Sequence, residues 1–151
     1  DNFPPCELNL IQRDGFYGWP FINGFGKLDP DYGDGKEDML TQSISPHFGF
    51  RAHNAPLGIH FLRHPNRPQA YKRAALVALH GSWNRSTPDG YKVISLHWSK
   101  EGKITSQDFL VNFLQENQKI IGRPVDIEEG PDGSIYISDD YAGVIYRVLY
   151  R

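Results

Sequence analysis

Short apolar runs alternate with clusters of turn-forming residues along the whole chain. These runs are rich in β-branched and aromatic residues and are bounded by Gly, Pro, Asn and Asp, a pattern that is typical of β-strands. The expected strands are residues 7–11, 48–52, 58–62, 75–80, 92–98, 109–114, 124–128, 134–138 and 144–150. The best candidate for a helix, residues 107–118, alternates in a strand-like way at Phe109, Val111 and Phe113. The pattern therefore predicts an all-β fold.

An internal repeat organises the second part of the chain. Its three segments match in order: residues 55–59 with 123–127, residues 76–80 with 135–139, and residues 90–94 with 143–147. Each copy predicts three antiparallel strands joined by tight turns, and residues 109–114 add a fourth strand to the first copy. Four-stranded units that repeat at this length favour the blades of a β-propeller, and a nine-stranded β-sandwich is the alternative.

The repeat predicts a single partial β-propeller domain over residues 1–151. About two and a half to three blades are expected, at approximately residues 1–50, 51–115 and 116–151. A propeller needs at least about four blades to close its ring. We therefore expect that the chain is part of a longer protein, or that two copies close one ring by isologous contact as a homodimer.

Composition excludes several classes of partner. The 16 Lys and Arg residues against 18 Asp and Glu residues give a formal charge of −2, which argues against a nucleic-acid binder because such a protein needs a basic face. No apolar run approaches the roughly 20 residues of a membrane span. The one cysteine, Cys6, excludes an intrachain disulfide framework. The acidic loop at residues 29–38 does not follow EF-hand spacing, so a solvated loop is favoured over a metal site.

Candidate chemistry is concentrated in residues 80–85, directly after the apolar run at residues 75–79. This stretch places His80, Ser82, Trp83, Asn84 and Arg85 within six residues. Arginine pairs carboxylates through two hydrogen bonds and tryptophan offers a stacking face, so the loop could bind a planar, anionic ligand. The alternative interpretation is a capped turn with Trp83 in the core and Arg85 paired with a surface acid.

Two further side chains precede expected first strands of blades. Arg123 lies between Gly122 and Pro124, a stiff context that suits an oriented guanidinium; an ion pair with Asp126 or Asp140 is the alternative. His53 could line a central cavity as an acid, base or donor, or be a hydrogen-bonded structural residue. The candidate cofactor-binding residues are thus Arg123, Arg85, Asn84, His80 and His53. Adjacent residues of a strand point to opposite faces, so Asp139 and Asp140 are not expected to form a catalytic pair.

Several motifs together resemble the C-terminal half of the glucose/sorbosone dehydrogenase family, and most closely its L-sorbosone dehydrogenase-like branch. The motifs are PPCELN at residues 4–9, FYGWP at 16–20, HNAPLG at 53–58, HGSWNR at 80–85, GRPVD at 122–126, PDG at 131–133 and SDD at 138–140. The resemblance implies a six-bladed β-propeller and an aldose dehydrogenase that uses pyrroloquinoline quinone (PQQ) and calcium. It also implies a periplasmic or secreted location.

The resemblance implies roles for particular residues. Cationic side chains from the two loops hold the carboxylates of the quinone in the family, and Arg123 takes the place of a family arginine. A family lysine falls near Asn84 or Arg85, with Arg85 as its substitute, and a second family arginine has no counterpart near Val125. Backbone carbonyls equivalent to residues 1–3 bind calcium in relatives. The catalytic histidine, a general base, belongs to the N-terminal half of the family, so no catalytic residue is assigned here.

The function expected from this resemblance is the C-terminal part of a PQQ-dependent sugar dehydrogenase. Such an enzyme oxidises a sugar by hydride transfer to PQQ with calcium as a Lewis acid, and we expect the chain alone to be inactive. The absent lysine and second arginine leave an alternative, a non-catalytic sugar-binding or scaffold propeller module that closes its ring by self-association. The expected partners are a sugar and either a second copy or the N-terminal half.

Overall fold

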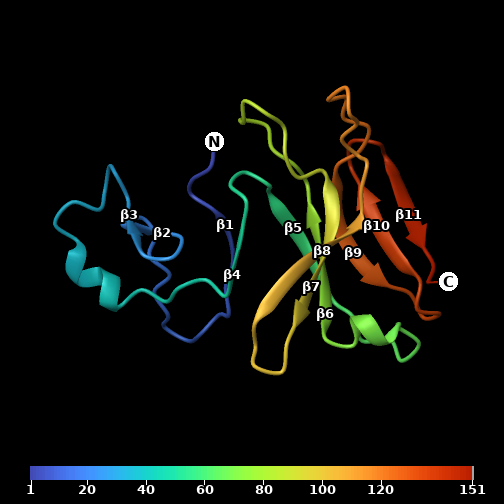
Figure 1. Cartoon of the computed structure of the whole chain (residues 1–151), viewed down its shortest axis with the longest axis horizontal. Coiled ribbons are helices and arrows are strands. Elements are labelled where there is room, and N and C mark those ends of the chain that lie inside the picture. Colours follow the sequence, from blue (N-terminus) through green and yellow to red (C-terminus); the bar gives the residue numbers. More distant parts are fainter. Residues whose placement is uncertain (151) are drawn as a thin grey trace. The chain divides into compact units, whose positions relative to one another are not determined.

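A computed structural model describes residues 1–150, which form two compact units divided after Ala52 (Figure 1). In the first unit, β1 (Cys6–Leu8) pairs with β4 (Phe48–Phe50), and β2 (Ile22–Asn23) pairs with β3 (Lys27–Leu28). A short 3-10 helix, η1 (Glu37–Thr41), begins within the last residues of the acidic loop. Most of this unit is therefore turns, which accords with its many Gly, Pro and Asp residues.

The second unit contains two antiparallel sheets, each with its strands in chain order. The first sheet has β5 (Pro56–Phe61), β6 (Ala74–Leu79), β7 (Lys92–Trp98) and β8 (Ile104–Leu110), with a short 3-10 helix, η2 (Gln69–Tyr71), between β5 and β6. The second sheet has β9 (Pro124–Glu129), β10 (Ile135–Asp139) and β11 (Val144–Val148). The predicted all-β class is confirmed. No helix within the described residues is long and apolar enough to cross a membrane.

The internal repeat is confirmed down to an irregularity in strand pairing. In both sheets the first strand begins with a Pro that pairs with the last residue of the second strand, and the register shifts before the next pair. The corresponding pairs are Pro56–Leu79 and Pro124–Asp139, Ile59–Val77 and Ile127–Ile137, His60–Leu76 and Glu128–Tyr136, and Phe61–Ala75 and Glu129–Ile135. The pairing equates Val77 with Ile137, so the predicted match of residues 76–80 with 135–139 is wrong by one residue.

The third strands show the same correction. Lys92 pairs with Leu79, and Val144 pairs with Asp139, so Lys92 and Val144 are equivalent. The predicted match of residues 90–94 with 143–147 is therefore also one residue out. A shift of one residue exchanges the two faces of a strand, and only the pairing of neighbouring strands settles which alignment is physical.

The predicted strand at residues 109–114 is wrong for most of its length, because β8 is Ile104–Leu110. This strand starts directly after the Gly102 turn and pairs with β7 from Trp98–Ile104 to Val93–Leu110. Asn112 has a positive φ of 72°, which ends the extended conformation. The predicted strand at residues 7–11 is shortened to Cys6–Leu8. The expected division into blades at residues 1–50, 51–115 and 116–151 stays a prediction.

The core lies between the two sheets of the second unit. Strand β6 has no polar side chain and is buried along its whole length. Leu76, Ala78 and Val93 from the first sheet form one buried cluster with Ile135 and Ile137 of the second. Because the side chains of β6 are buried on both faces, the strand is a continuous apolar run without alternation.

Truncation in this core should destabilise the protein, whereas truncation on the outer strand should not. Ile137 is 0% exposed and Ile145 is 71% exposed. We expect Ile137→Ala to lower the free energy of unfolding by about 2–5 kcal/mol through lost burial and a cavity. The matched variant Ile145→Ala should change it by less than about 0.5 kcal/mol. Urea denaturation followed by circular dichroism measures both, and equal losses would contradict this description of the core.

Candidate functional site

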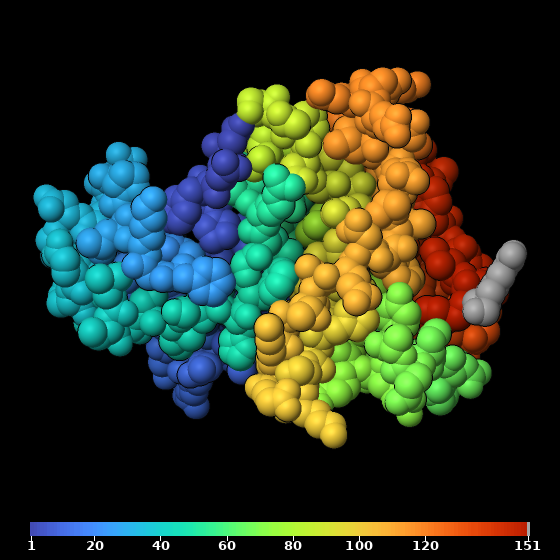
Figure 2. All heavy atoms as spheres, in the orientation of Figure 1, coloured from blue at the N-terminus to red at the C-terminus, as the bar shows by residue number. Residues whose placement is uncertain are grey.

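The candidate site lies where the loop between β6 and β7 meets the segment before β9. Both loops extend from the same end of the second unit, in yellow-green and orange (Figures 1 and 2). His80 is the first residue after β6, and Arg123 is the last residue before β9. The backbone N–H of His80 donates to the Ala55 carbonyl at 3.0 Å. The end of the buried strand β6 therefore determines where the polar loop begins.

Arg123 joins the two loops. Its Nε donates to the His80 carbonyl oxygen at 3.1 Å, and its Nη2 donates to the Gly81 carbonyl oxygen at 2.7 Å. The guanidinium carbon lies 5.5 Å from the centre of the Tyr91 ring, a cation–π distance. Arg123 forms no ion pair within residues 1–150, so the alternative of a pair with Asp126 or Asp140 is wrong. Two backbone carbonyls and an aromatic face hold the guanidinium in one orientation.

His80 binds a carboxylate from the second sheet. Its Nε2 lies 3.0 Å from Oδ1 of Asp140, the residue after β10. This hydrogen bond lowers the pKa of Asp140 below its ordinary value of 3.8 and outweighs the opposing effect of desolvation; the charges of His80 and Arg123 lower the pKa further. The neighbouring Asp139 is buried and accepts hydrogen bonds from the Ala142 N–H and the Tyr146 hydroxyl. The two adjacent aspartates therefore have different hydrogen-bond partners, and the expectation that they do not form a catalytic pair stays a prediction.

The loop after His80 is fixed by its own hydrogen bonds. The backbone N–H of Ser82 donates to the Asp89 carbonyl at 2.9 Å, and the Asp89 N–H donates to the Ser82 hydroxyl at 3.0 Å. The Tyr91 hydroxyl donates to the Ser82 carbonyl, and the Asn54 amide donates to the Asp89 carboxylate at 2.9 Å. These contacts make a rigid frame for the carbonyls that hold Arg123.

Backbone strain gathers in the same region. His53, Ala55 and Tyr91 have positive φ angles of 64°, 49° and 51°, which side-chain-bearing residues adopt at a cost. All three flank residues that hold the loop in place. Strained non-glycine residues of this kind concentrate at ligand sites, where the surrounding structure maintains them.

The other predicted site residues lie apart from Arg123. Arg85 donates from Nε to the Thr87 carbonyl at 3.2 Å, and Asn84 is exposed. Trp83 is 84% exposed, so the alternative that places it in the core is wrong. No contact within the described residues joins His53 or Asn84 to Arg123. The structure thus brings together Arg123 and His80, and adds Tyr91 and Asp140, which the sequence did not assign to a ligand.

A shallow pocket of about 370 Å³ adjoins this cluster. Its lining includes Ser138, Asp139, Asp140 and the apolar side chains of Val144 and Ile145. A hydroxyl, a carboxylate and apolar surface together suit a hydroxylated ligand that lies next to Asp140. Within residues 1–150, no group of three or more His, Cys, Asp or Glu side chains is placed to hold a metal ion.

Comparison with known proteins agrees with this fold. The family model described as TrAA12-like matches residues 32–151. An uncharacterised protein of Borreliella burgdorferi is 42% identical over 155 residues, which cover 100% of this chain and 40% of that protein. The PQQ-dependent pyranose dehydrogenase of Coprinopsis cinerea is 31% identical over 127 residues, which cover 72% of this chain and 17% of the dehydrogenase.

Solved structures show the same architecture. The calcium structure of a Trichoderma reesei carbohydrate-active enzyme of family AA12 matches with a TM-score of 0.75 at 21% identity, covering 95% of this chain and 42% of that one. The holo form of the PQQ domain of the Coprinopsis cinerea pyranose dehydrogenase matches with a TM-score of 0.65 at 26% identity, covering 88% and 40%.

The two sheets are therefore blades of a β-propeller of the kind found in quinone-dependent sugar dehydrogenases. The chain belongs to the TrAA12-like family. It spans 40% or less of the length of these two curated relatives.

The close packing of Gly81 on Tyr91 gives a test of the loop frame. Gly81 has a φ of 96°, and a Cβ atom there would overlap the Tyr91 ring. Gly102 has a φ of 84° with no atom within 4 Å of such a Cβ, so Gly102→Ala isolates the backbone cost. We expect Gly102→Ala to cost about 1 kcal/mol and Gly81→Ala about 2–4 kcal/mol of unfolding free energy. Equal costs in urea denaturation would show that Gly81 does not pack on Tyr91.

The lowered pKa of Asp140 predicts a pH-dependent contribution to stability. A carboxyl group whose folded pKa lies below its unfolded value stabilises the protein above the unfolded pKa, and this contribution is lost as pH falls through the folded pKa. Asp140→Asn should therefore destabilise the protein at about pH 6 and do so by a smaller amount at about pH 2. The exposed control Glu116→Gln should have no effect at either pH. An Asp140→Asn effect that is equally large at low pH in urea denaturation would contradict the His80–Asp140 interaction.

Proposed function

We propose that this chain supplies cofactor-binding loops to a quinone-dependent sugar oxidoreductase. The observation that carries the proposal is the orientation of Arg123 by the His80 and Gly81 carbonyls. A guanidinium held in this way is a prepared partner for a carboxylate, because little side-chain entropy remains to be lost on binding. The pyranose dehydrogenase relative is named as PQQ-dependent, and PQQ is a planar quinone that carries carboxylates.

The residues present fit one carboxylate of such a quinone. Arg123 uses Nε and Nη2 for the protein's own carbonyls, which leaves Nη1 without a partner among residues 1–150. Arg85 is a second cation, on the loop after His80, and its Nε already donates to the Thr87 carbonyl. Asn84 and Val125 stand where the family resemblance places cationic side chains, so they add no charge. When bound, PQQ would accept the hydride equivalent that leaves the sugar during oxidation.

The remaining residues of the cluster hold and shape this binding surface. The Asp140 carboxylate fixes the ring of His80, and the carbonyl of His80 in turn fixes Arg123. The ring of Tyr91 lies at a cation–π distance from the guanidinium and helps to hold it. The exposed indole of Trp83 offers a flat apolar face on the same loop, suited to a quinone or to a sugar ring.

Neither a calcium ligand nor a catalytic base is assigned to this chain under the proposal. Among the described residues, no group of three or more His, Cys, Asp or Glu side chains is placed to hold a metal ion. The base that takes the proton from the sugar hydroxyl is expected from the rest of the propeller. Binding of PQQ without turnover is therefore the expected behaviour of the chain alone.

A sugar-binding propeller without quinone chemistry is the second candidate. The supporting observation is the shortage of cations around Arg123: Asn84 is neutral, Val125 is apolar, and the Asp140 carboxylate is close enough for Arg123 to affect its pKa. A carboxylate beside the guanidinium weakens the attraction for an anionic cofactor. The neighbouring pocket with Ser138 and Asp140 could still bind hydroxyl groups.

Titration with PQQ in the presence of calcium separates the two candidates. We expect saturable binding by calorimetry, and Arg123→Gln should weaken it about 10- to 100-fold, the effect of removing a charged hydrogen bond. Lys119→Gln removes the same charge from an exposed loop and should leave the affinity unchanged. Circular dichroism should show that both variants are folded. Equal affinity of wild type and Arg123→Gln would overturn the proposed cofactor loop and favour the sugar-binding module.

A further inference from the structure

The loops at the two ends of the second unit differ in charge. Three loops form the end that carries the candidate cofactor residues, and they contain three Lys or Arg residues against three carboxylates: residues 80–91, 111–123 and 140–143. Three other loops form the opposite end, which we call the basic end: residues 62–73, 99–103 and 130–134. The basic end contains six Lys or Arg residues against two carboxylates. The excess of positive charge therefore lies at the end away from Arg123.

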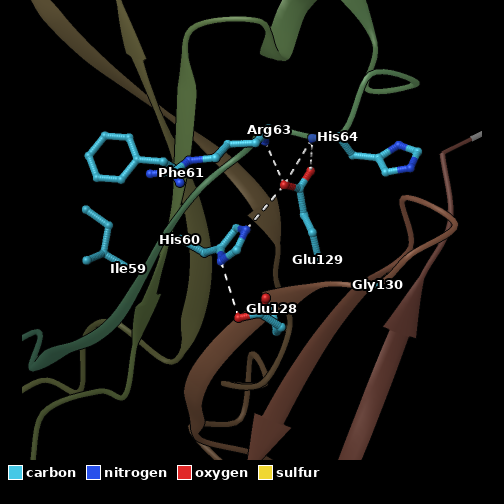
Figure 3. Close-up of a pocket in the computed structure, with 8 residues that line it drawn as sticks. All are labelled: Ile59, His60, Phe61, Arg63, His64, Glu128, Glu129 and Gly130. Carbon is cyan, nitrogen blue, oxygen red and sulfur yellow. Dashed lines mark hydrogen bonds and ion pairs between the residues drawn. The ribbon is translucent and has the colours of Figure 1, made fainter.

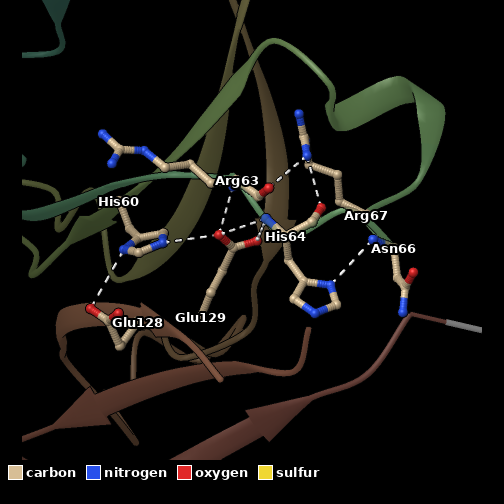
Figure 4. A network of polar contacts seen from close by, with 7 residues as sticks. All are labelled: His60, Arg63, His64, Asn66, Arg67, Glu128 and Glu129. Carbon is tan, nitrogen blue, oxygen red and sulfur yellow. Dashed lines mark hydrogen bonds and ion pairs between the residues drawn. The ribbon is translucent and has the colours of Figure 1, made fainter. Parts of the chain in front are cut away.

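Arg67 gives the longest loop of the basic end its shape. Its Nη1 donates to the carbonyl oxygens of Arg63 at 2.9 Å and His64 at 2.8 Å (Figure 4). Its Nη2 donates to the Lys72 carbonyl oxygen at 3.3 Å. The loop is thus fixed through its backbone carbonyls, and its other cationic side chains take no part in this network.

Five cationic side chains of the basic end are exposed and unpaired. They form no hydrogen bond or ion pair within residues 1–150: Arg63, Lys72, Arg73, Lys100 and Lys103. Elsewhere in the unit, Lys92 pairs with Asp108 at 2.6 Å, and Arg123 is bonded to backbone carbonyls. The free cations of the basic end are therefore available to an anionic partner.

Carboxylates offset only part of this charge. Asp132 pairs with Arg147 at 2.5 Å. The Glu129 side chain is 9% exposed, and its carboxylate accepts two backbone N–H groups of the neighbouring loop, at 2.6 and 3.1 Å (Figure 3). Exposed carboxylates remain at Glu101, in the turn after β7, and at Glu128 in β9. Five free cations thus face two exposed carboxylates.

Aromatic side chains lie at the base of the same loops. Phe61 is the last residue of β5 and is 48% exposed. Its ring lies 5.5 Å from the ring of Trp98, the last residue of β7. The Trp98 backbone N–H donates to the Arg73 carbonyl at 3.0 Å, so the rings and the cations are adjacent. Cations outside a layer of aromatic rings suit the interface of a bilayer, where cations contact the headgroups and rings lie at the boundary of the hydrocarbon.

The freedom of these cations favours a lipid surface over an acidic protein. Long side chains without partners can each follow a separate headgroup on a fluid surface. A protein partner would have to hold them in one arrangement, at a cost in side-chain entropy for each. The cations also come from two loops at one end of the sheets, a placement that allows them to contact one flat surface together.

We propose that the basic end binds the surface of a bilayer that contains anionic phospholipids. The five free cations contact the lipid phosphate groups, and Phe61 and Trp98 lie at the level of the headgroups. The end that carries Arg123 then faces away from the bilayer and stays open to solvent. The proposal uses no residue of the proposed cofactor loops, so either proposal can fail without the other.

Co-sedimentation of the 151-residue chain with vesicles tests this proposal. We expect binding to phosphatidylcholine vesicles that contain about one third phosphatidylglycerol, and no binding to phosphatidylcholine alone. High salt should release the protein, because it screens exposed charges. Lys72→Gln/Lys100→Gln should weaken binding about 30-fold, roughly fivefold for each cation near the surface. Arg13→Gln/Lys119→Gln removes the same charge from exposed sites elsewhere and should leave the affinity unchanged.

Tryptophan quenching by brominated phosphatidylcholine in the same vesicles tests the orientation. Trp19→Phe/Trp83→Phe leaves Trp98 as the fluorophore, and we expect it to be quenched. Trp19→Phe/Trp98→Phe leaves Trp83, which is 84% exposed at the cofactor end and should not be quenched. Circular dichroism should show that all variants are folded.

Four results would overturn the proposal. They are no binding to the anionic vesicles, equal binding by the two charge variants, quenching of Trp83 in place of Trp98, and binding of inorganic polyphosphate without binding to vesicles. The last result would assign the basic end to a soluble polyanion.

Discussion

Burial of β6 is the constraint on which the rest of the second unit depends. The six residues Ala74–Leu79 are all apolar and buried. A shift in the pairing of this strand would not move a polar side chain into the core, but it would displace the side chains that pack on both of its faces. The pairing of this strand with β5 and β7 fixes where the apolar run ends. His80 is the first side chain after that end, and Arg123 binds the carbonyls of His80 and Gly81. The site therefore takes its position from a strand that contributes no functional group.

The repeat also explains why polar side chains meet in pairs. The strand pairing makes His80 equivalent to Asp140, and His60 equivalent to Glu128. Each of these pairs is in contact, at 3.0 Å for His80 and Asp140 and 3.6 Å for His60 and Glu128. Consecutive blades are related by rotation about one axis, so equivalent positions of neighbouring blades lie next to each other around that axis. A histidine in one blade and a carboxylate in the next thus give complementary contacts at two places, between the first strands and after the ends of the second strands.

Sequence reasoning located the strands and loops better than the contacts between them. The strand at Lys92–Trp98 has the predicted bounds, because an apolar run with turn residues on both sides depends only on local chemistry. The alignment of the two repeat copies was out by one residue, since the register shift after Pro56 and Pro124 has no signature in residue type. The strand that begins at Ile104 was placed too late, because alternation continues past Asn112 although the backbone turns there.

In the candidate site too, the sequence indicated the residues whose type suggests a role but not those whose role depends on distant contacts. The HGSWNR loop and Arg123 could be selected from their residue types, and they do meet in the structure. Tyr91 and Asp140 could not be assigned, because their roles depend on which side chains lie across the sheet. The corrected repeat alignment would have pointed to Asp140, because it makes Asp140 the equivalent of His80 in the second copy. Tyr91 has no such signal, and only packing against Gly81 reveals it.

Arg123 and Arg63, both in the second unit, differ in the conformational entropy that each would lose on binding a ligand. Arg123 has two of its nitrogens bonded to backbone carbonyls and a ring beneath it, so most of its rotational freedom was lost on folding. Arg63 is exposed and has no bonded partner for its guanidinium within the described residues, so a ligand must order it at a cost of about 0.5–1.5 kcal/mol. An anion that binds Arg123 would therefore meet a guanidinium that folding has already oriented.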